Sequence, residues 1–276
     1  MPLPHGAIPA RGHSGKLPLG RRVVIPGNNP TQALMAATGF VSTARDLVRF
    51  FGQLSPGATR SVLSVESRRE MVRRQWLDPQ SSGERHYGLG LTSGKLAEWS
   101  WFGHGGGFQG FITRTLVLPQ RELAISVLTN AADGLAHPWL EGVVHILRAF
   151  EKNGAPDRKL GSWGGRWWSL WGAVDLVPMT GKVLVATPSL LNPFLDASEI
   201  TVTAKDRGKI TQATGTGSHG QSVRRMRDRE GEAAELWLGG SKLLPEAEVA
   251  REMRERYEAS LGRNGAIRRL KVAARR

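Results

Sequence analysis

Residues 102–130 read FGHGGGFQGFITRTLVLPQRELAISVLTN. In this stretch His104 is followed by three consecutive glycines, Gly105, Gly106 and Gly107. A glycine run loses more backbone entropy on folding than other residues do, so it is retained where something must approach the bare backbone. The run therefore predicts a site at which a phosphate, a dinucleotide or an acyl oxyanion meets the main chain.

The residues that come after the glycine run predict a hairpin and then a helix. Residues 111–118 and 122–130 are two β-prone apolar runs with a short turn between them, which is typical of an antiparallel pair. Residues 123–128 are apolar in both alternating registers, so we expect this strand to be covered on both faces. Pro138 is expected to open a helix. Its apolar side would consist of Leu140, Val143, Val144, Leu147 and Phe150.

Two helices and two further strands are predicted upstream of the glycine run. Thr43 and Asp46 have the spacing of a capping box at the start of an amphipathic helix, and a second helix is expected at 64–75. Residues 86–94 and 98–104 have the composition of strands. The fold class predicted for this part is α/β (α+β), an antiparallel sheet flanked by helices.

The pattern of predicted secondary structure changes after residue 152. Six short β-type runs alternate with turn signals at intervals of roughly ten residues, which predicts a small antiparallel barrel or sandwich. The four tryptophans between residues 163 and 171 are expected to pack in cores and interfaces: Trp163, Trp167, Trp168 and Trp171. The organisation predicted for the chain is an arm at 1–38, a first domain at 39–152, a β-rich accessory domain at 153–249 and a basic tail at 250–276.

Bulk composition excludes several classes of protein. The chain has 276 residues, 40% of them hydrophobic, and no cysteine, so a disulfide framework and a thiolate nucleophile are excluded. The net charge of +14 is concentrated at the two ends, and no strand interleaves basic and aromatic residues, so we expect no nucleic-acid partner. We expect no membrane span and no signal peptide. The cytoplasm is the default compartment, and the periplasm stays open if the true N-terminus lies upstream.

Two familiar glycine motifs fit the run poorly. Residues 105–110 match GxGxxG, but a dinucleotide fingerprint needs a helix after it, and residues 111–118 predict a strand. Residues 104–107 match the HGGG loop of lipase-type hydrolases, but that loop works with a GxSxG nucleophile elbow, which no serine of the chain provides.

Three segments taken in order favour a different family. The segments ATGFVSTARDLVRFF (37–51), YGLGL (87–91) and residues 102–130 resemble the β-lactamase-related, class C-like branch of the penicillin-recognising serine hydrolases. The resemblance covers roughly residues 33–150. It implies the C-terminal part of a β-lactamase/transpeptidase-like domain, and an activity of serine acyl-enzyme hydrolysis of an amide or ester, with no cofactor.

The resemblance also implies roles for single residues. His104 would occupy the position of the basic residue in the family's Lys-Thr-Gly or His-x-Gly motif, with Gly105 in place of its hydroxyl residue and Gly106 as its glycine. The backbone N–H of Gly107 would be an oxyanion donor, a role in which a strand amide needs no reorganisation as charge develops. We therefore expect His104 and Gly107 in catalysis, and Gly105, Gly106 and Phe108 in substrate binding.

The sequence departs from the family pattern at three points. Gly105 lacks the hydroxyl that would contact a substrate carboxylate, which puts β-lactam specificity in doubt. No serine has a lysine three residues later, and the near miss from Ser42 ends in Arg45, whose guanidinium cannot act as a base. Neither Tyr87 nor Tyr257 begins a Tyr-x-Asn element.

In the family, the missing motifs precede every segment matched here. The resemblance therefore predicts a truncated hydrolase that is inactive alone. It would act on a small-molecule amide or ester only when completed by the missing N-terminal lobe, for which a separate N-terminal half is a candidate partner. The alternatives are a non-catalytic ligand- or partner-binding module, and an intact hydrolase with an unrecognised nucleophile.

The region around Pro138 contains three side chains of types that bind metals. His137, Glu141 and His145 are spaced four residues apart and could share one helix face. We place His137 before the helix, because it precedes the proline. The sequence therefore predicts no metal.

Overall fold

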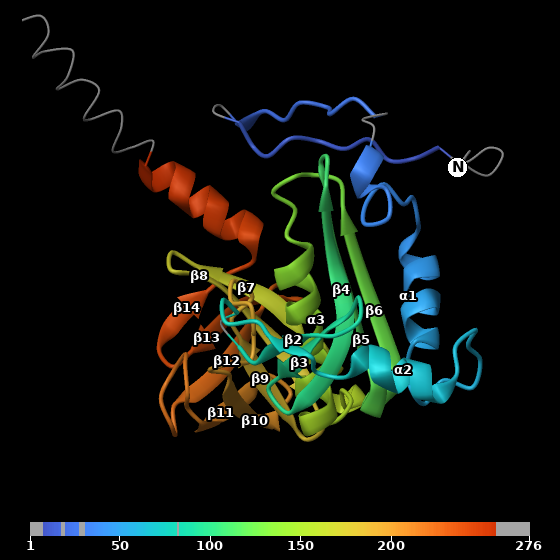
Figure 1. The fold of residues 1–276 in the computed structure, drawn as a ribbon. Coiled ribbons are helices and arrows are strands. Elements are labelled where there is room, and N and C mark those ends of the chain that lie inside the picture. Colours follow the sequence, from blue (N-terminus) through green and yellow to red (C-terminus); the bar gives the residue numbers. More distant parts are fainter. Residues whose placement is uncertain (1–7, 18–19, 28–30, 82, 258–276) are drawn as a thin grey trace, which may run out of the picture. The chain divides into compact units, whose positions relative to one another are not determined.

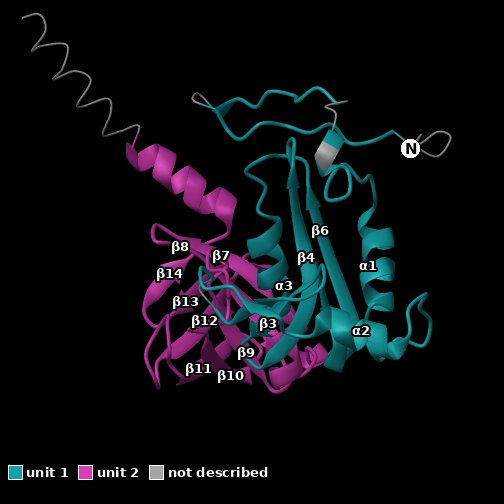
Figure 2. Cartoon of the chain, in the orientation of Figure 1, with its two compact units in different colours: residues 1–144 teal, residues 145–276 magenta. Residues whose placement is uncertain are grey.

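The computed structural model describes residues 8–17, 20–27, 31–81 and 83–257. The chain divides into two compact units, residues 1–144 and 145–276 (Figure 2). Most of the expected basic tail, from residue 258 onward, lies outside the described residues.

The first unit contains a six-stranded antiparallel sheet in which each strand pairs with its neighbour in sequence (Figure 1). Its strands are β1 (Trp76–Leu77), β2 (Arg85–Tyr87), β3 (Thr92–Leu96), β4 (Trp99–Phe108), β5 (Phe111–Leu118) and β6 (Leu123–Thr129). The glycine run lies in β4, and β5 and β6 form the expected hairpin around a 3-10 turn, η3 (Pro119–Arg121). The predicted mixture of helices and an antiparallel sheet is confirmed.

The expectation that residues 123–128 are covered on both faces is wrong. The strand β6 is at the edge of the sheet, and its residues are half-buried, with Leu128 38% exposed. The neighbouring β5 is the buried strand, from Arg114 to Leu118. Helix α1 (Ala44–Gln53) packs against β5 and β6 (Figure 1). Strand order, which the apolar pattern does not encode, decides which of two apolar strands is central.

Helix α1 begins at the predicted Thr43 cap, and helix α2 lies within the range expected for the second helix. The Thr43 hydroxyl oxygen accepts a hydrogen bond from the Asp46 N–H at 3.1 Å and donates to the Asp46 carboxylate at 2.9 Å. Helix α2 (Val65–Val72) begins after Ser64, whose hydroxyl oxygen accepts from the Ser67 N–H. The core under these helices contains Leu54, Leu91, Phe102 and Val117.

Helix α3 (Ala136–Asn153) begins two residues before Pro138, so His137 lies in its first turn. The expectation that His137 precedes the helix is therefore wrong. Proline is tolerated throughout the first turn, because the N–H groups there have no intrahelical partner. Leu140 and Val144 are fully buried on the predicted apolar side, whereas Val143 is 38% exposed. The division between the two units falls within this helix.

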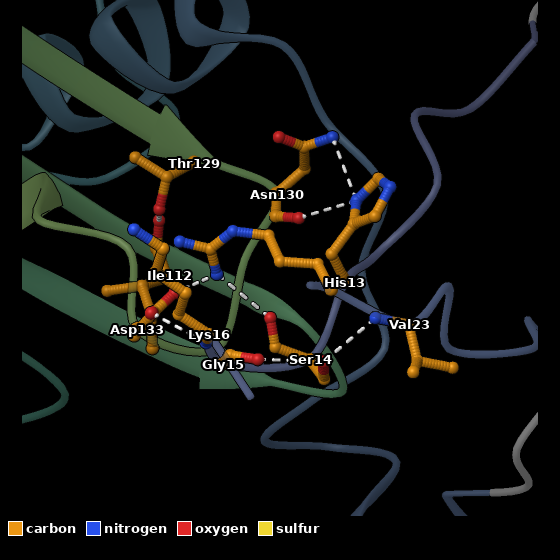
Figure 3. A network of polar contacts seen from close by, with 10 residues as sticks. His13, Ser14, Gly15, Lys16, Val23, Ile112, Thr129, Asn130 and Asp133 are labelled. Carbon is orange, nitrogen blue, oxygen red and sulfur yellow. Dashed lines mark hydrogen bonds and ion pairs between the residues drawn. The ribbon is translucent and has the colours of Figure 1, made fainter. Parts of the chain in front are cut away.

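The N-terminal arm is joined to one end of the sheet. Its described residues form an irregular hairpin, in which the Ser14 N–H donates to the Val23 carbonyl at 2.8 Å. The His13 N–H donates to the Asn130 carbonyl at 3.0 Å, just beyond β6. The His13 ring Nδ1 also lies 3.0 Å from this carbonyl oxygen (Figure 3). Gly110, in the β4–β5 turn, has φ +89°, and a β-carbon there would stand 2.6 Å from the His13 nitrogen. The arm thus belongs to the first unit, and a short 3-10 helix, η2 (Gln32–Leu34), comes after it.

Asp133 fixes the arm to the loop after β6. Its carboxylate accepts from the Lys16 N–H at 2.9 Å and forms an ion pair with Arg22, whose guanidinium also donates to the Ser14 carbonyl (Figure 3). These contacts lower the pKa of the Asp133 carboxylate to about 2, and the hydrogen bond from Arg22 has the largest effect.

The second unit is an eight-stranded antiparallel meander. Its strands are β7 (Gly165–Ser169), β8 (Gly172–Met179), β9 (Lys182–Ala186), β10 (Ser198–Ala204), β11 (Arg207–Gln212), β12 (Ser222–Arg227), β13 (Ala233–Leu238) and β14 (Ser241–Leu243). Backbone hydrogen bonds in both directions between Trp168 and Leu244, at 2.8 and 2.9 Å, join the first strand to the end of the last. The sheet thus closes as a barrel, and the six predicted strands gain β7 and β14.

Apolar side chains fill the inside of this barrel. The main cluster includes Trp163 from the 3-10 helix η4 (Arg158–Trp163) and Trp167 from β7, whereas Trp171, at a hairpin tip, is 99% exposed. The expected tryptophan packing therefore holds for the first two residues and is wrong for Trp171. Arg225 is buried under the Trp163 ring, 4.3 Å from its centroid, and donates to the Lys205 carbonyl at 2.6 Å. Among the described residues, no helix is long and apolar enough to cross a bilayer.

Candidate active site

The glycine half of β4 lies at an unpaired strand edge. Strand β3 pairs with β4 only from Leu96↔Trp99 to Thr92↔Gly103, so residues 104–108 of β4 pair with β5 alone within the described chain. An open cavity of about 390 Å³ lies at this edge. It is lined by Asp78, Arg85, His86, Tyr87, Thr92, His104, Gly105, Gly106, Gly107, Ile112, Arg114 and His137.

The three glycines leave space that other side chains fill. A β-carbon on Gly105 would stand 2.8 Å from two ring atoms of His137, at the start of α3. A β-carbon on Gly106 would stand 2.7 Å from the Thr113 hydroxyl, and one on Gly107 would be 3.3 Å from Ile112. At Gly105, therefore, the bare backbone is needed by the protein's own imidazole.

His104 has a defined hydrogen-bonding state. Its Nδ1 lies 2.5 Å from the Gly105 carbonyl oxygen, which can only accept, so Nδ1 carries the proton. In the neutral ring, Nε2 is then the acceptor, and it faces the Tyr87 hydroxyl at 3.1 Å. The two rings meet edge to face, with centroids 5.8 Å apart.

Arg114 is a buried cation on the wall of the cavity. It is the cross-strand neighbour of Gly105, is only 6% exposed, and lies over the Trp101 ring at 4.7 Å. Burial is the main cause that lowers the pKa of Arg114 to about 10, and repulsion from Arg85 is the second. Attraction by Glu141 opposes this shift and is weaker. The guanidinium is still charged at neutral pH. Within the described residues, no carboxylate or carbonyl accepts a hydrogen bond from it.

The other basic groups of the cavity differ from Arg114. Arg85 is paired with Asp78, to which its Nε donates at 2.8 Å. The pKa of His137 is lowered, chiefly by burial and then by Arg114 and Arg85, while a hydrogen bond to the Thr113 backbone opposes the shift. His137 is therefore neutral at pH 7, and the one carboxylate on the wall is already paired.

The structure brings most of the expected site residues together. His104, Gly105, Gly106 and Gly107 all line the cavity, whereas Phe108 does not. The sequence reasoning missed Tyr87, Arg85, Asp78, Arg114 and His137. Arg114 could have been found from the hairpin register, which places it opposite Gly105, while His137 was assigned to the wrong side of the helix start.

Few other reactive groups lie on the wall. Its hydroxyls belong to Tyr87 and Thr92, and the Thr92 hydroxyl donates to the Gly103 carbonyl at 2.9 Å. In the described part of the chain, no three His, Asp or Glu side chains gather as a metal site would require.

Three solved structures are similar to parts of this chain. The octameric penicillin-binding protein homologue from Pyrococcus abyssi is 17% identical, with a TM-score of 0.42, over 86% of this chain and 53% of its own. SurE is 19% identical, with a TM-score of 0.39, over 88% and 58%. A D-stereospecific amidohydrolase from Streptomyces sp. is 26% identical, with a TM-score of 0.39, over 47% and 36%. The chain thus spans about half the length of the first two structures. A search of curated proteins found no match.

A family model gives the assignment. The model described as Beta-lactamase matches residues 2–139. The match includes the glycine strand, the hairpin after it and the arm, and so begins earlier than the resemblance drawn from residue 33 onward. The chain therefore belongs to the β-lactamase family.

Proposed function

We propose that the cavity is one wall of the acyl-binding site of a β-lactamase-related serine hydrolase, and that its amide or ester substrate carries a carboxylate. The observation that supports this proposal is Arg114, a buried guanidinium on the cavity wall beside the glycine strand. No carboxylate of the described chain forms an ion pair with it, and only the weaker attraction of Glu141 acts on its charge.

A buried cation without an anion is costly. Transfer of an ammonium-sized or guanidinium-sized ion into a protein interior costs several kcal/mol even after relaxation, and only a well-placed opposite charge offsets this cost. The guanidinium is planar, presents parallel N–H groups and matches a carboxylate with two hydrogen bonds. An anionic ligand would restore at Arg114 the interaction that the family's hydroxyl residue, absent at Gly105, no longer supplies.

We assign the remaining roles by family pattern. His104 would act at the position of the basic motif residue, the Gly107 N–H would donate to the oxyanion, and Gly105 and Gly106 would lie along the acyl group. The sequence contains no Ser-x-x-Lys element, so a serine nucleophile of the family's kind would have to come from another chain. This chain alone should then form no serine acyl-enzyme, and an N-terminal half that supplies the motif is its expected partner.

A non-catalytic binding module is the alternative function. The same Arg114 supports it, because anion binding needs no nucleophile. Addition of a lobe that contains the Ser-x-x-Lys motif distinguishes the two functions, since the hydrolase gains turnover and the module does not.

Calorimetric titration with N-acetylalanine and with its uncharged amide tests the anion site. We expect the acid to bind at least about tenfold more tightly, a difference of about 1.4 kcal/mol. Arg114→Met should abolish that preference, whereas Arg45→Met, on the exposed face of α1, should leave it intact. Equal affinity for the acid and the amide would refute the carboxylate assignment. A fluorophosphonate adduct on a serine of the purified chain would refute the missing nucleophile.

A further inference from the structure

We infer that Tyr87 and His104 form a nucleophile–base pair, and that the chain can accept an acyl group on the Tyr87 hydroxyl without any serine. The inference stands apart from the carboxylate site, because it concerns the oxygen that attacks and not the group that anchors the substrate.

The hydrogen-bond polarity of the pair supports a base role for His104. The Gly105 carbonyl holds the proton on Nδ1 at 2.5 Å, so the lone pair of Nε2 points at the Tyr87 hydroxyl, 3.1 Å away. A nucleophile within hydrogen-bond reach of a base, with a third group that orients the base, is the arrangement that activates hydroxyls in covalent catalysis. Here the orienting group is a backbone carbonyl of the glycine strand.

The backbone holds Tyr87 in place for this contact. Tyr87 pairs with Trp76 on one side and Thr92 on the other, so both edges of its strand are occupied. The next residue, Gly88, approaches α2 so closely that a β-carbon would stand 2.4 Å from the Met71 carbonyl oxygen. The phenol is thus presented from a fixed strand end.

The cavity makes Tyr87 accessible. Tyr87 is 41% exposed and lines the same wall as Arg85 and Arg114. The other hydroxyl on the wall, that of Thr92, is engaged with the Gly103 carbonyl and has no base beside it in the described chain.

The reaction balances without a further reagent except water. The Tyr87 oxygen attacks the carbonyl carbon of an ester, and its proton passes to Nε2 of His104. The bond from the carbonyl carbon to the leaving oxygen then breaks, and the leaving group takes the proton from His104 or departs as a stable phenolate, in which case the proton is lost to solvent. The product is an aryl ester on Tyr87. Water, with His104 again as the base, hydrolyses it to the carboxylic acid and restores the phenol.

Acetylation by 4-nitrophenyl acetate tests the pair. The reagent is uncharged, so its reaction does not depend on the carboxylate site, and either inference can fail while the other holds. Peptide mapping locates each acetyl group, and hydroxylamine separates O-acetyl tyrosine, which it cleaves, from N-acetyl lysine. The chain has only two tyrosines, so Tyr257 is the internal control.

We expect Tyr87 to be acetylated at least about tenfold faster than Tyr257, a threshold below the roughly 10²–10⁴-fold that a positioned base usually contributes. His104→Gln should remove most of that difference, Tyr87→Phe should remove the adduct, and Tyr257→Phe should not affect it. Equal rates at the two tyrosines in the unaltered chain would overturn the inference, even if the His104 variant failed to fold. An unchanged Tyr87 rate in a folded His104→Gln variant would also overturn it, since the pair would then be only structural.

Discussion

The imidazole of His137 occupies the space in which Gly105 would carry a side chain. Two of its ring atoms lie 2.8 Å from the position of that missing β-carbon. Two residues far apart in the sequence thus depend on each other, because the glycine at position 105 leaves room for a histidine from α3.

Gly105→Ala should lower the free energy of unfolding by about 1–3 kcal/mol, the usual cost of overpacking. His137→Ala in the same chain should recover most of this loss, because it removes the ring that the new methyl group meets. Gly107→Ala is the matched control and should cost less, since its neighbour at 3.3 Å is the end of the Ile112 side chain. Denaturant melts of these three variants and of His137→Ala alone check the coupling, and additive losses for the Gly105 and His137 changes would contradict it.

Arg114→Met should leave the fold at least as stable as it was, although it deletes a buried charge. The desolvation of the guanidinium exceeds the roughly 0.5–2 kcal/mol that its contact with Trp101 supplies. Arg114→Lys should keep the charge but bind N-acetylalanine about tenfold more weakly than the unaltered chain, because an ammonium lacks the planar fork. Thermal melts and calorimetry measure the two effects. A large loss of stability in the Met variant would show that Arg114 is a structural cation with a partner of its own.

The stability of the first unit should fall with acid below about pH 6.5, the ordinary pKa of histidine, because the pKa of folded His137 is depressed. The unfolded chain therefore binds the proton at a higher pH than the folded chain does. The contribution of His137 to the free energy of unfolding is fully present above about pH 6.5 and is lost as the pH falls through the pKa of folded His137. His137→Gln should flatten this part of the profile. His145, whose pKa is also lowered by burial, is the control: His145→Gln should leave the contribution of His137 in place. An unchanged acid limb in the His137 variant would contradict the assignment.

Asp133→Asn should loosen the arm from the sheet. The unaltered chain should lose the contribution of this carboxylate as the pH falls from about 3.8 to about 2, since the folded pKa is the lower one. The variant should show no such transition and should be cut more rapidly by protease at residues 11–25. Asp46→Asn, at the cap of α1, tests whether any lost surface carboxylate has the same effect on the arm.

Arg225→Ala should destabilise the barrel by about 1–3 kcal/mol, because the Ser162 and Lys205 carbonyls lose their buried donor. Its side chain is 1% exposed and lies 3.0 Å from the Asp206 carboxylate. Arg224→Ala, at the exposed neighbouring position on β12, should change stability by less than about 0.5 kcal/mol. Equal effects of the two changes would show that the buried contacts contribute nothing.

Local signals in the sequence predicted much of the fold. The cap at Thr43, the β5–β6 hairpin and six barrel strands depend on residues close together in the chain, and all are present. The burial of β6 depends on strand order, and the exposure of Trp171 depends on its position at a hairpin tip. An apolar pattern records neither property.

The residues of the candidate site also fall into those that a local motif predicts and those that it does not. His104 and the three glycines stand together in one motif, so the sequence placed them on one strand. Arg114 and His137 reach that strand through pairing register and through the exact start of α3, and neither has a motif of its own. Proline is tolerated at several first-turn positions, so Pro138 alone could not determine whether His137 lay inside the helix.

The seam between Trp168 and Leu244 sets the order in which the barrel can assemble. Every other pairing in the meander joins strands that are consecutive in the chain, so each can form as soon as its short turn has closed. The seam can form only last, because it joins the first strand to Leu244, the residue that follows β14. A nascent chain that ends before residue 244 should therefore form an open, curved sheet with two unpaired edge strands, which can pair with other chains. The last few residues of the barrel close the sheet and remove both edges.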